Sequence, residues 1–369
     1  MNALRVYDEL TAARTRFLRV EELCRLASEK GALPPAAELA AEAARPLKEK
    51  KGVEKAQGAF LAEILANPVA GTHLCHAMLL PLEASRKKLD EYQRKGELDL
   101  GSVHLKRHGK ASVLTTRNPR YLNAEDEETL PGTEIAVDLA LLDPNTEVCV
   151  LRGDVVTHTK HAGRRLFGAG INLTHLYEGR IRYLWYLIRD LGFVNKLYRG
   201  LAHESQSPEV ASTEKLWIAA LEGFAIGGHC QILLTMDYTI AAADAYLTLP
   251  ARKEGIIPGA ANLRLPRFVG DRIARQAILA ELRIECDSPQ GRMICDDVVA
   301  DVDARLEEIV EKLTSSGVVS AAGNRRAFRA GEEPLDAFRR YMAVYAREQA
   351  YCHLSPALVA NLEKNWKKK

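Results

Sequence analysis

The chain has 369 residues, 47% of them hydrophobic, which is enough to bury a large core and to form one medium-sized enzyme domain with additions. Its 51 basic and 49 acidic residues nearly cancel, and the net charge of +2 argues against a nucleic-acid or membrane-surface partner. No apolar run approaches the roughly 20 residues of a membrane span, and residues 1–9 lack the apolar core of a signal peptide, so we expect a cytoplasmic protein.

The first part of the chain, residues 4–101, has a helical pattern. It is rich in Ala, Leu, Glu, Lys and Arg, and apolar residues recur at helical spacing, as at Phe60, Leu61, Ile64 and Leu65. Helix-breaking residues interrupt this pattern at Gly31, Pro34–Pro35, Pro46 and Asn67–Pro68. We therefore predict an N-terminal helical domain over residues 1–109, serving as an oligomer contact or a lid over the core.

The cysteines indicate reduced thiols and no metal centre. The chain has seven, widely spread, without a Cys-x-x-Cys pair. His73, Cys75 and His76 come nearest to a metal-ligand cluster, but a structural zinc site usually takes four ligands in paired spacing, and no second pair follows. We expect no bound metal.

The middle of the chain, residues 110–315, alternates strand and helix patterns. Strands are predicted at 111–116, 147–152 and 215–220, with a helix at 133–142 between the first two. This alternation is typical of an α/β domain with a parallel sheet and crossover helices. From residue 316 to 369 the pattern is helical again, which gives a C-terminal helical region that ends in a lysine-rich segment.

The most informative segment is Gly-Phe-Ala-Ile-Gly-Gly-His-Cys-Gln at 223–231. The apolar residues 216–220 lead into it and another apolar run follows, so we expect a strand, a tight turn and a helix. Gly227 and Gly228 carry no Cβ, which lets backbone N–H groups approach a ligand at a helix N-terminus, where negative charge is favoured. The turn could hold an oxyanion; alternatively, it only lets a helix pack closely on a strand.

Two further glycine-containing blocks, 164–173 and 249–267, accompany this turn. Together the three blocks resemble those of the crotonase (enoyl-CoA hydratase/isomerase) superfamily. The resemblance implies a spiral of ββα repeats and an oxyanion hole for a CoA thioester, made by the backbone N–H groups of Ile171 and Gly228. One such donor is worth about 3 kcal/mol of transition-state stabilisation.

The positions of the hydratase carboxylates differ in this chain. Where hydratases of the superfamily carry two glutamates, this sequence has Gln231 and Ala251. An amide does not take up a proton near neutral pH, and alanine does no proton chemistry. The sequence therefore argues against hydration of a double bond.

A narrower resemblance, covering nearly the whole chain, is to the cofactor-independent 3,5-dihydroxyphenylacetyl-CoA 1,2-dioxygenases of glycopeptide-antibiotic pathways. Its residues are Ala-Gly-Ile-Asn-Leu at 169–173, the turn with Gln231, and the continuous stretch 254–265. It implies an arylacetyl-CoA substrate, O2 as co-substrate, no metal, flavin or other cofactor, and release of CoA and an arylglyoxylate. The superfamily also implies a homo-oligomer, a trimer or a dimer of trimers.

The resemblance also assigns the site residues. Gln231 would position the reacting carbonyl or peroxide, while Glu125 and Arg189 would orient the ring hydroxyls; alternatively, these two are an exposed carboxylate at a helix start and a solvent-facing helical arginine. The remaining substrate-binding residues implied are Ala169, Gly170 and Asn172 near the thioester arm, Leu173 and Ile256 around a dry pocket for O2, and Lys160 near the CoA phosphates.

Several alternatives stay open from sequence. His229 stands where the dioxygenases have a small residue, and it is either a base or a side chain pointing away from the ligand. The same oxyanion hole would also serve an acyl-CoA hydrolase or isomerase that does not use O2. A scaffold or nucleic-acid-binding role with the lysine-rich end as its footprint is a third interpretation, against which the balanced charge argues.

Overall fold

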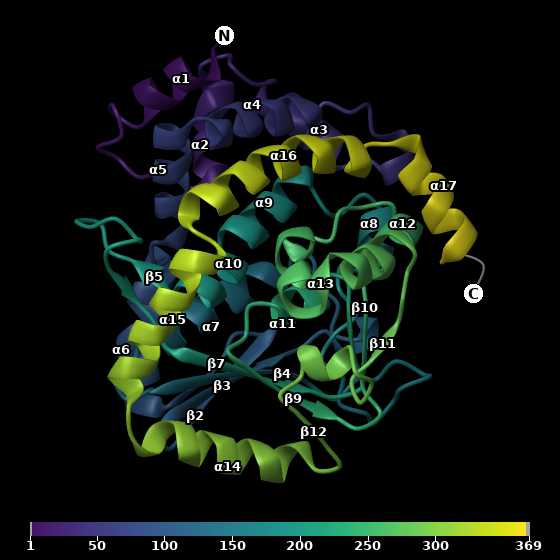
Figure 1. Cartoon of the computed structure of the whole chain (residues 1–369). Coiled ribbons are helices and arrows are strands. Elements are labelled where there is room, and N and C mark those ends of the chain that lie inside the picture. The colour runs from purple at the N-terminus through teal and green to yellow at the C-terminus, as the bar shows by residue number, and fades with distance from the viewer. Residues whose placement is uncertain (1, 367–369) are drawn as a thin grey trace.

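The computed structural model describes residues 2–366, so the last three lysines of the lysine-rich end lie outside the described residues. Its main sheet has seven strands in the order β1-β2-β3-β4-β7-β9-β12 (Figure 1). Their bounds are Glu97–Asp99, Val103–His108, Ala111–Thr116, Val148–Gly153, Leu216–Leu221, Tyr238–Ala242 and Asp297–Val299. From β3 to β12 the neighbours are parallel, as the alternation of strand and helix patterns predicted.

A second sheet carries the glycine turn. It has three strands, β8 (Phe224–Ile226), β10 (Tyr246–Thr248) and β11 (Ile284–Glu285), while β5 (Leu201–Ala202) and β6 (Ser212–Thr213) form a separate pair. The expectation that the strand at 216–220 leads directly into the turn was wrong, because β8 in the second sheet intervenes. The turn therefore lies where the chain crosses from one sheet to the other.

The N-terminal part is helical as far as Lys95, but the helical domain predicted over residues 1–109 extends too far, because β1 and β2 pair with β3 in the main sheet. Its helices are α1 (Ala3–Leu10), α2 (Val20–Glu29), α3 (Ala36–Ala43), the 3₁₀-helix η1 (Leu47–Glu49), α4 (Lys55–Ala66), α5 (Pro68–Leu79) and α6 (Glu83–Lys95). At the predicted break between α4 and α5, the Asn67 side chain accepts hydrogen bonds from the backbone N–H groups of Val69 and Ala70, and Pro68 takes the first helical position, where no N–H is needed.

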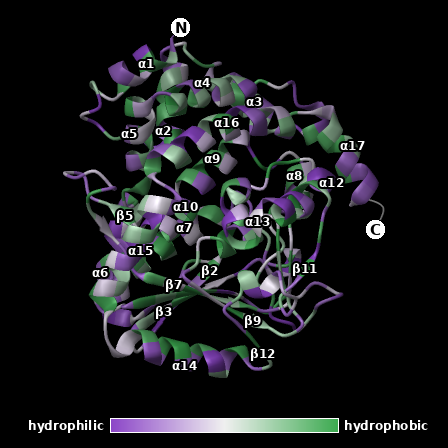
Figure 2. Ribbon diagram, viewed as in Figure 1, coloured by the Kyte–Doolittle hydropathy of each residue, from purple (hydrophilic) through white to green (hydrophobic). Residues whose placement is uncertain are grey.

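The helices of the middle part cover both faces of the main sheet. They are α7 (Leu130–Leu142), α8 (Leu173–Tyr177), α9 (Tyr183–Leu191), α10 (Phe193–Arg199), α11 (Gly228–Leu233), α12 (Ala251–Glu254), α13 (Ala261–Leu279) and α14 (Val302–Ser315), with 3₁₀-helices η2 (Pro119–Tyr121) and η3 (Gly291–Met293). Leu306 and Ile309 of α14 pack on Val150 and Ile218 on one face, and Figure 2 shows the polar and apolar residues of this amphipathic helix. The opposite face forms the main core, beneath α7, α9 and α10 (Figure 1).

The C-terminal helices return to the N-terminal part. They are α15 (Val318–Glu332), α16 (Leu335–His353) and α17 (Pro356–Asn365). Helix α16 crosses the molecule between α4 and α9 (Figure 1), and its Ala350 lies so close to Gly58 of α4 that a Cβ on the glycine would stand 2.6 Å from the alanine Cβ. The first and last parts of the chain thus pack directly on one another.

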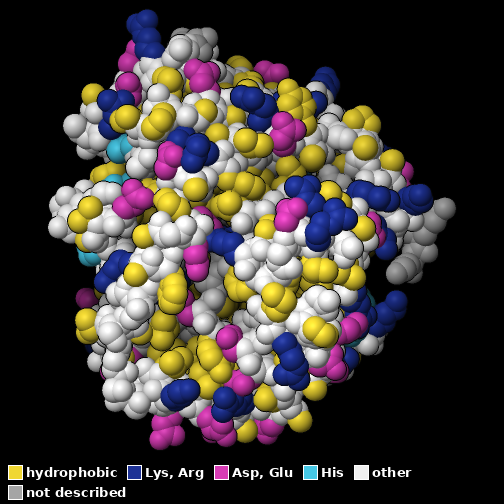
Figure 3. Space-filling view, viewed as in Figure 1, with side chains coloured by type: hydrophobic (Ala, Val, Ile, Leu, Met, Phe, Trp, Pro, Cys, Tyr) yellow, Lys and Arg dark blue, Asp and Glu magenta, His cyan; other side chains and the backbone are white. Residues whose placement is uncertain are grey.

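The visible surface carries mixed charge. Figure 3 shows Lys and Arg interspersed with Asp and Glu, with no extended area of one sign on this face. None of the helices in residues 2–366 combines the length and the apolar composition needed to cross a bilayer.

Candidate active site

The two predicted oxyanion-hole donors lie on adjoining segments. The segment at 168–171 runs beside β8, where the Gly168 N–H donates to the Phe224 carbonyl at 3.1 Å and the Ile226 N–H donates to the Gly168 carbonyl at 3.0 Å. A Cβ on Gly170 would stand only 3.0 Å from the backbone nitrogen of Gly228. Within the described residues, neither Ile171 nor Gly228 donates its N–H to a backbone acceptor, so both N–H groups are available to a ligand.

A small cavity borders both donors. Its volume is about 30 Å³, which holds roughly one water molecule and no aromatic ring. It is lined by Ile171, Trp185, Tyr186, Arg189, Asp190, Gly227, Gly228, Gln231, Glu254, Ile256, Ile257, Pro258, Gly259 and Tyr345. Four of these, at 185, 186, 189 and 190, recur at the spacing of one face of α9. A ring can enter only if side chains of this wall move.

Arg189 is buried at the centre of the site with all its donors in use. Its Nε and Nη2 bind the two oxygens of Glu125 at 2.9 and 2.7 Å, Nη1 binds Asp190 at 2.7 Å and also the Gln231 side-chain oxygen, and Nη2 reaches the Gly228 carbonyl at 2.9 Å. Burial would lower the pKa of Arg189, but the carboxylates of Glu125 and Asp190 raise it above its ordinary value. The solvent-facing alternative for Arg189 is wrong.

This arrangement affects how a ring hydroxyl could bind. A guanidinium has five N–H donors, and Arg189 uses five, so it can bind a hydroxyl only by releasing a partner. Glu125 keeps free acceptor capacity on its two oxygens and lies next to the hole, since a Cβ on Gly228 would stand 2.8 Å from its Oε2. The geometry therefore favours Glu125 over Arg189 as the residue that directly contacts a ring hydroxyl.

Gln231 is held from both ends. Its oxygen accepts from Arg189, and its Nε2 donates to Asp190 at 3.1 Å. Gly259 makes room for it, because a Cβ there would lie 2.2 Å from Gln231 Nε2. These contacts fix the orientation of the amide: its N–H side faces a carboxylate and its oxygen faces the arginine.

His229 lies behind the oxyanion hole and not on the surface. Its Nδ1 accepts the Gly170 N–H at 3.0 Å, and a Cβ on Gly168 would stand 2.2 Å from its Nε2. Burial lowers the pKa of His229 to about 4, with Glu125 opposing and Arg189 adding to the effect. The neutral ring thus holds the segment that carries Ile171, and it does not line the cavity at the donors.

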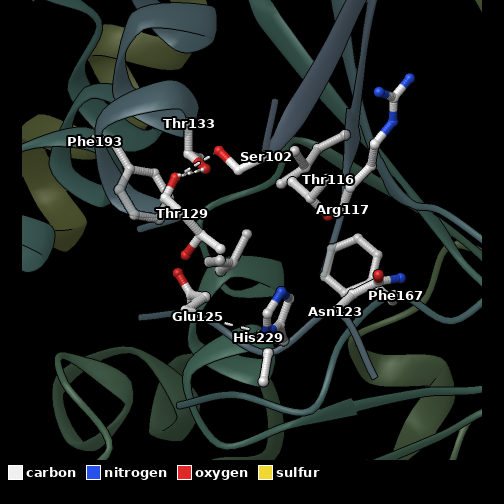
Figure 4. A pocket seen from close by; sticks show the side chains of 13 residues that line it. Ser102, Thr116, Arg117, Asn123, Glu125, Thr129, Thr133, Phe167, Phe193 and His229 are labelled. Atoms are coloured by element: carbon white, nitrogen blue, oxygen red, sulfur yellow. Dashed lines mark hydrogen bonds and ion pairs between the residues drawn. The ribbon is translucent and has the colours of Figure 1, made fainter. Parts of the chain in front are cut away.

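A second small cavity has Glu125 in its wall. Figure 4 shows Glu125 and His229 together at one end, the rings of Phe167 and Phe193 on the walls, and the hydroxyl of Thr133 at the far end. Its volume is about 20 Å³. Glu125, the side chain predicted to meet the ring, thus lines this second cavity, and its link to the cavity beside the donors is its pair with Arg189.

The other predicted substrate-binding residues, Ile256 apart, do not line the cavity beside the donors. Asn172 begins α8, where its side-chain oxygen accepts the His175 N–H at 3.2 Å and its Nδ2 donates to Asp126 at 3.0 Å. Leu173 packs on the main core and Ala169 on a cluster beside β8, whereas Gly170 carries the N–H bound by His229. Lys160 lies exposed in the loop between Val155 and Arg165.

Sequence reasoning missed Glu254, Asp190 and Tyr345, although all three line the cavity. Glu254 and Asp190 lie within or beside quoted motifs, but neither occupies a hydratase carboxylate position. Tyr345 comes from α16, where burial and the nearby carboxylate of Asp190 raise the pKa of its phenol. No sequence signal connects this distant helix to the site.

The described residues contain no group of three His, Cys, Asp or Glu side chains placed to hold a metal ion. The ring of His73 is hydrogen-bonded through Nδ1 to the Tyr7 hydroxyl at 2.7 Å and stacks on Phe17. His76 Nε2 contacts the His203 carbonyl oxygen at 2.8 Å. Both histidines thus take part in packing and hydrogen bonding within the N-terminal part.

Known proteins similar to the chain agree with this geometry. The family described as "Enoyl-CoA hydratase/isomerase" matches residues 108–342. The chain is 45% identical over 354 residues to a (3,5-dihydroxyphenyl)acetyl-CoA 1,2-dioxygenase of Amycolatopsis orientalis, covering 95% of this chain and 81% of that protein. It is 29% identical over 238 residues to a short-chain-enoyl-CoA hydratase of Clostridium acetobutylicum, covering 63% and 83%.

Solved structures share the fold. An enoyl-CoA hydratase from Mycobacterium avium subsp. paratuberculosis superimposes with a TM-score of 0.59 at 19% identity, over 73% of this chain and 98% of that one. One from Bacillus halodurans gives 0.58 at 16% identity, over 72% and 100%. The family match over residues 108–342 and the 45% identity over 95% of the chain show that the chain belongs to the crotonase (enoyl-CoA hydratase/isomerase) superfamily, in agreement with the shared fold.

Proposed function

We propose that the protein is a cofactor- and metal-independent dioxygenase that oxidises an arylacetyl-CoA, 3,5-dihydroxyphenylacetyl-CoA in particular, to an arylglyoxylate and free CoA. The observation that carries the proposal is the pair of available N–H groups at Ile171 and Gly228, beside a cavity where an arginine-bound amide, Gln231, replaces the hydratase carboxylate. The 45% identity to the Amycolatopsis dioxygenase supports the choice of reaction.

The proposed reaction starts from the acidity of the carbon next to the thioester carbonyl. The Ile171 and Gly228 N–H groups hold the carbonyl oxygen, which stabilises the enolate formed when that carbon loses a proton. The electron-rich enolate passes one electron to O2 and combines with it. The resulting peroxide closes on the thioester carbonyl and expels CoA as its thiolate. The α-carbon then loses its second proton, and the electron pair of that C–H bond forms the keto group as the O–O bond breaks, which leaves both oxygen atoms in the arylglyoxylate.

The other predicted residues have supporting roles in this proposal. Gln231, fixed between Arg189 and Asp190, presents its amide to the reacting carbonyl or peroxide. Glu125 accepts a ring hydroxyl, and Arg189 orients Glu125 and Gln231 together. Ile256, with Leu173 behind it, keeps the O2 pocket dry. Ala169, Gly170 and Asn172 lie along the thioester arm and Lys160 meets the CoA phosphates, in an assembly of trimers.

The test is dissolved-oxygen uptake by chelator-treated protein given 3,5-dihydroxyphenylacetyl-CoA, with free thiol followed in parallel and a nitrogen-purged control. We expect equimolar loss of O2 and release of thiol, with both rates reduced in Gln231→Ala. Thiol release that persists under nitrogen would identify an acyl-CoA hydrolase instead, and double-bond migration in an enoyl-CoA without O2 loss would identify an isomerase. Unchanged turnover in Gln231→Ala would remove that residue from the mechanism.

A further inference from the structure

The cavity beside the two donors contains five titratable side chains, namely Tyr186, Arg189, Asp190, Glu254 and Tyr345. Enolate formation needs one of them, or a group outside, to take the proton from the carbon next to the thioester. Neither Gln231 nor Ala251 can accept it. A base among the lining residues must have a proton-accepting atom that is not already bound by a neighbour.

Four of the five are already committed. Arg189 stays a cation, and Asp190 accepts from both Arg189 and Gln231. Burial raises the pKa of the Tyr186 and Tyr345 phenols well above their ordinary value, and the carboxylate of Asp190 adds to the rise at Tyr345, so both phenols stay protonated. These groups are poor proton acceptors near neutral pH.

Two titratable residues that lie next to the donor segments but outside this cavity are also occupied. Glu125 is bound by the Nε and Nη2 of Arg189 in a bidentate pair, and in the proposed function its remaining acceptor capacity is used by a ring hydroxyl. His229 uses Nδ1 to accept the Gly170 N–H, and this ring lies behind the donors. Both hold the architecture of the hole in place.

Glu254 is different, because no hydrogen bond or ion pair in the described part of the chain engages its carboxylate. It is the last residue of α12, and its Oε2 lies 3.5 Å from the point where a Cβ would stand on Gly227, the residue before the Gly228 donor. Gly227 has a φ of +53°, in the left-handed region, so a Cβ-bearing residue there would be strained. The carboxylate thus stands at the rim of the oxyanion turn, inside the cavity.

The surroundings of Glu254 suit a base. Burial raises its pKa to about 8, Glu281 adds to the rise, and Lys253 opposes it. Tyr186 of α9 also interacts with it, and α17 places the neutral amides of Asn361 and Asn365 against the backbone of α12. A base with a pKa near the working pH combines adequate ionisation with strong proton affinity.

We propose that Glu254 is the catalytic base that removes the α-proton of the CoA thioester. The proposal rests on the proposed function and names the residue that starts it. The C–H bond breaks, its electron pair moves toward the carbonyl to give the enolate, and the proton goes to a carboxylate oxygen of Glu254. The enolate oxygen is held by the Ile171 and Gly228 N–H groups.

The test separates proton removal from oxidation. Wild-type protein, Glu254→Gln, Glu254→Asp and the control Glu281→Gln are incubated under nitrogen in D2O with 3,5-dihydroxyphenylacetyl-CoA, and deuterium at the α-carbon is followed by mass spectrometry against an enzyme-free blank. We expect Glu254→Gln to lose exchange by about 100-fold or more and Glu254→Asp to keep part of it. Glu281→Gln should exchange normally, with its pH midpoint shifted downward.

The pH dependence adds a second readout. Wild-type exchange should rise with pH and level off above about 8, where Glu254 is ionised. A carboxyl whose pKa is raised by folding makes the protein less stable as pH climbs from its unfolded value toward the folded one. Glu254→Gln removes that penalty, so its Tm should match wild type near pH 5 and exceed it near pH 8, which also shows that the variant folds.

The results test separately whether Glu254 is the base and whether the protein is a dioxygenase. Unchanged exchange in Glu254→Gln, or no wild-type exchange above the blank, overturns Glu254 as the base. Wild-type exchange that disappears in Glu254→Gln, in a protein that takes up no O2 in air, supports the base and overturns the dioxygenase. If wild-type protein takes up O2 and Glu254→Gln does so equally well, the dioxygenase is supported and Glu254 is overturned as the base.

Discussion

At the scale of single residues, Gly168 decides where His229 can sit. A Cβ on Gly168 would stand 2.2 Å from the ring nitrogen, and the ring cannot yield without losing its hydrogen bond to the Gly170 N–H. We expect Gly168→Ala to displace the ring, loosen the segment bearing Ile171 and lower turnover by about 10- to 100-fold, since a small misplacement of a reacting group has an effect of this order. Steady-state O2 uptake measures it.

The matched control is Gly323→Ala on α15, where a Cβ would meet nothing within 4 Å. Alanine there should leave activity unchanged and stabilise the helix by up to about 1 kcal/mol. A Gly168→Ala enzyme as fast as wild type would mean that His229 does not position the oxyanion hole. Because the pKa of His229 is lowered to about 4, wild-type turnover should show no change from this residue's titration between about pH 5 and pH 8.

At the scale of elements, the carboxylate of Glu333 joins the C-terminal helices to the core. It follows α15, is fully buried, and binds Arg199 of α10 at 3.0 Å and Arg264 and Arg267 of α13 at 3.0 and 2.7 Å. Removing a carboxylate from such a network leaves buried cations unpaired. We expect Glu333→Ala to lower the free energy of unfolding by about 3–5 kcal/mol in urea denaturation.

Asp271→Ala on α13 is the control, since Asp271 pairs with Arg275 in an exposed i,i+4 arrangement at 2.7 Å and should cost about 0.5 kcal/mol or less. Burial alone would raise the pKa of Glu333, but the three arginines, with Arg264 foremost, hold it at about 2. A carboxyl with a lowered folded-state pKa stabilises the protein above its unfolded value and loses this effect as pH falls from about 4.5 to 2. Equal costs for the two variants would mean that the network stabilises nothing.

At the scale of the whole molecule, local signals in the sequence predicted much of the fold. The strand at 111–116 coincides with β3, the other two predicted strands lie within one residue of β4 and β7, and the break at Asn67–Pro68 separates two helices as expected. Turn chemistry and periodicity are local, so a sequence shows them directly.

Contacts between distant segments were not predictable in this way. Tyr345 reaches the cavity from α16, and the five hydrogen bonds of Arg189 go to four residues in three segments of the chain. The resemblance to a family predicted which residues lie around the oxyanion hole. It did not predict that every N–H donor of Arg189 is hydrogen-bonded within the protein. Glu254 lies outside the hydratase carboxylate positions, so no motif pointed to it, and the lack of a hydrogen-bond partner for its carboxylate within residues 2–366 is visible only in three dimensions.

The predicted division into residues 1–109, 110–315 and 316–369 leads to a test of cooperativity. Helix α16 packs on α4 at Gly58, which should make the three parts unfold together. The accessibility of the cysteines shows whether each part has unfolded. Cys24 and Cys75 belong to the first part and four others to the middle, and all six are buried. Cys352, in the last part, is partly exposed. Burial raises the pKa of Cys75 and Cys149 to about 12, which keeps their thiols unreactive while folded.

We therefore expect a thiol-alkylating reagent to modify Cys352 first in native protein, and Cys24, Cys75 and Cys149 at one common denaturant concentration, as measured by peptide mass spectrometry across a urea series. Circular dichroism on the same samples gives the global midpoint against which each cysteine is compared. Modification of Cys24 and Cys75 well below that midpoint would show that the N-terminal helices open independently. In that case the buried contact between α4 and α16 does not couple the N-terminal helices to the core. The position of Tyr345 in the cavity wall would then depend on the contacts of α16 with α9.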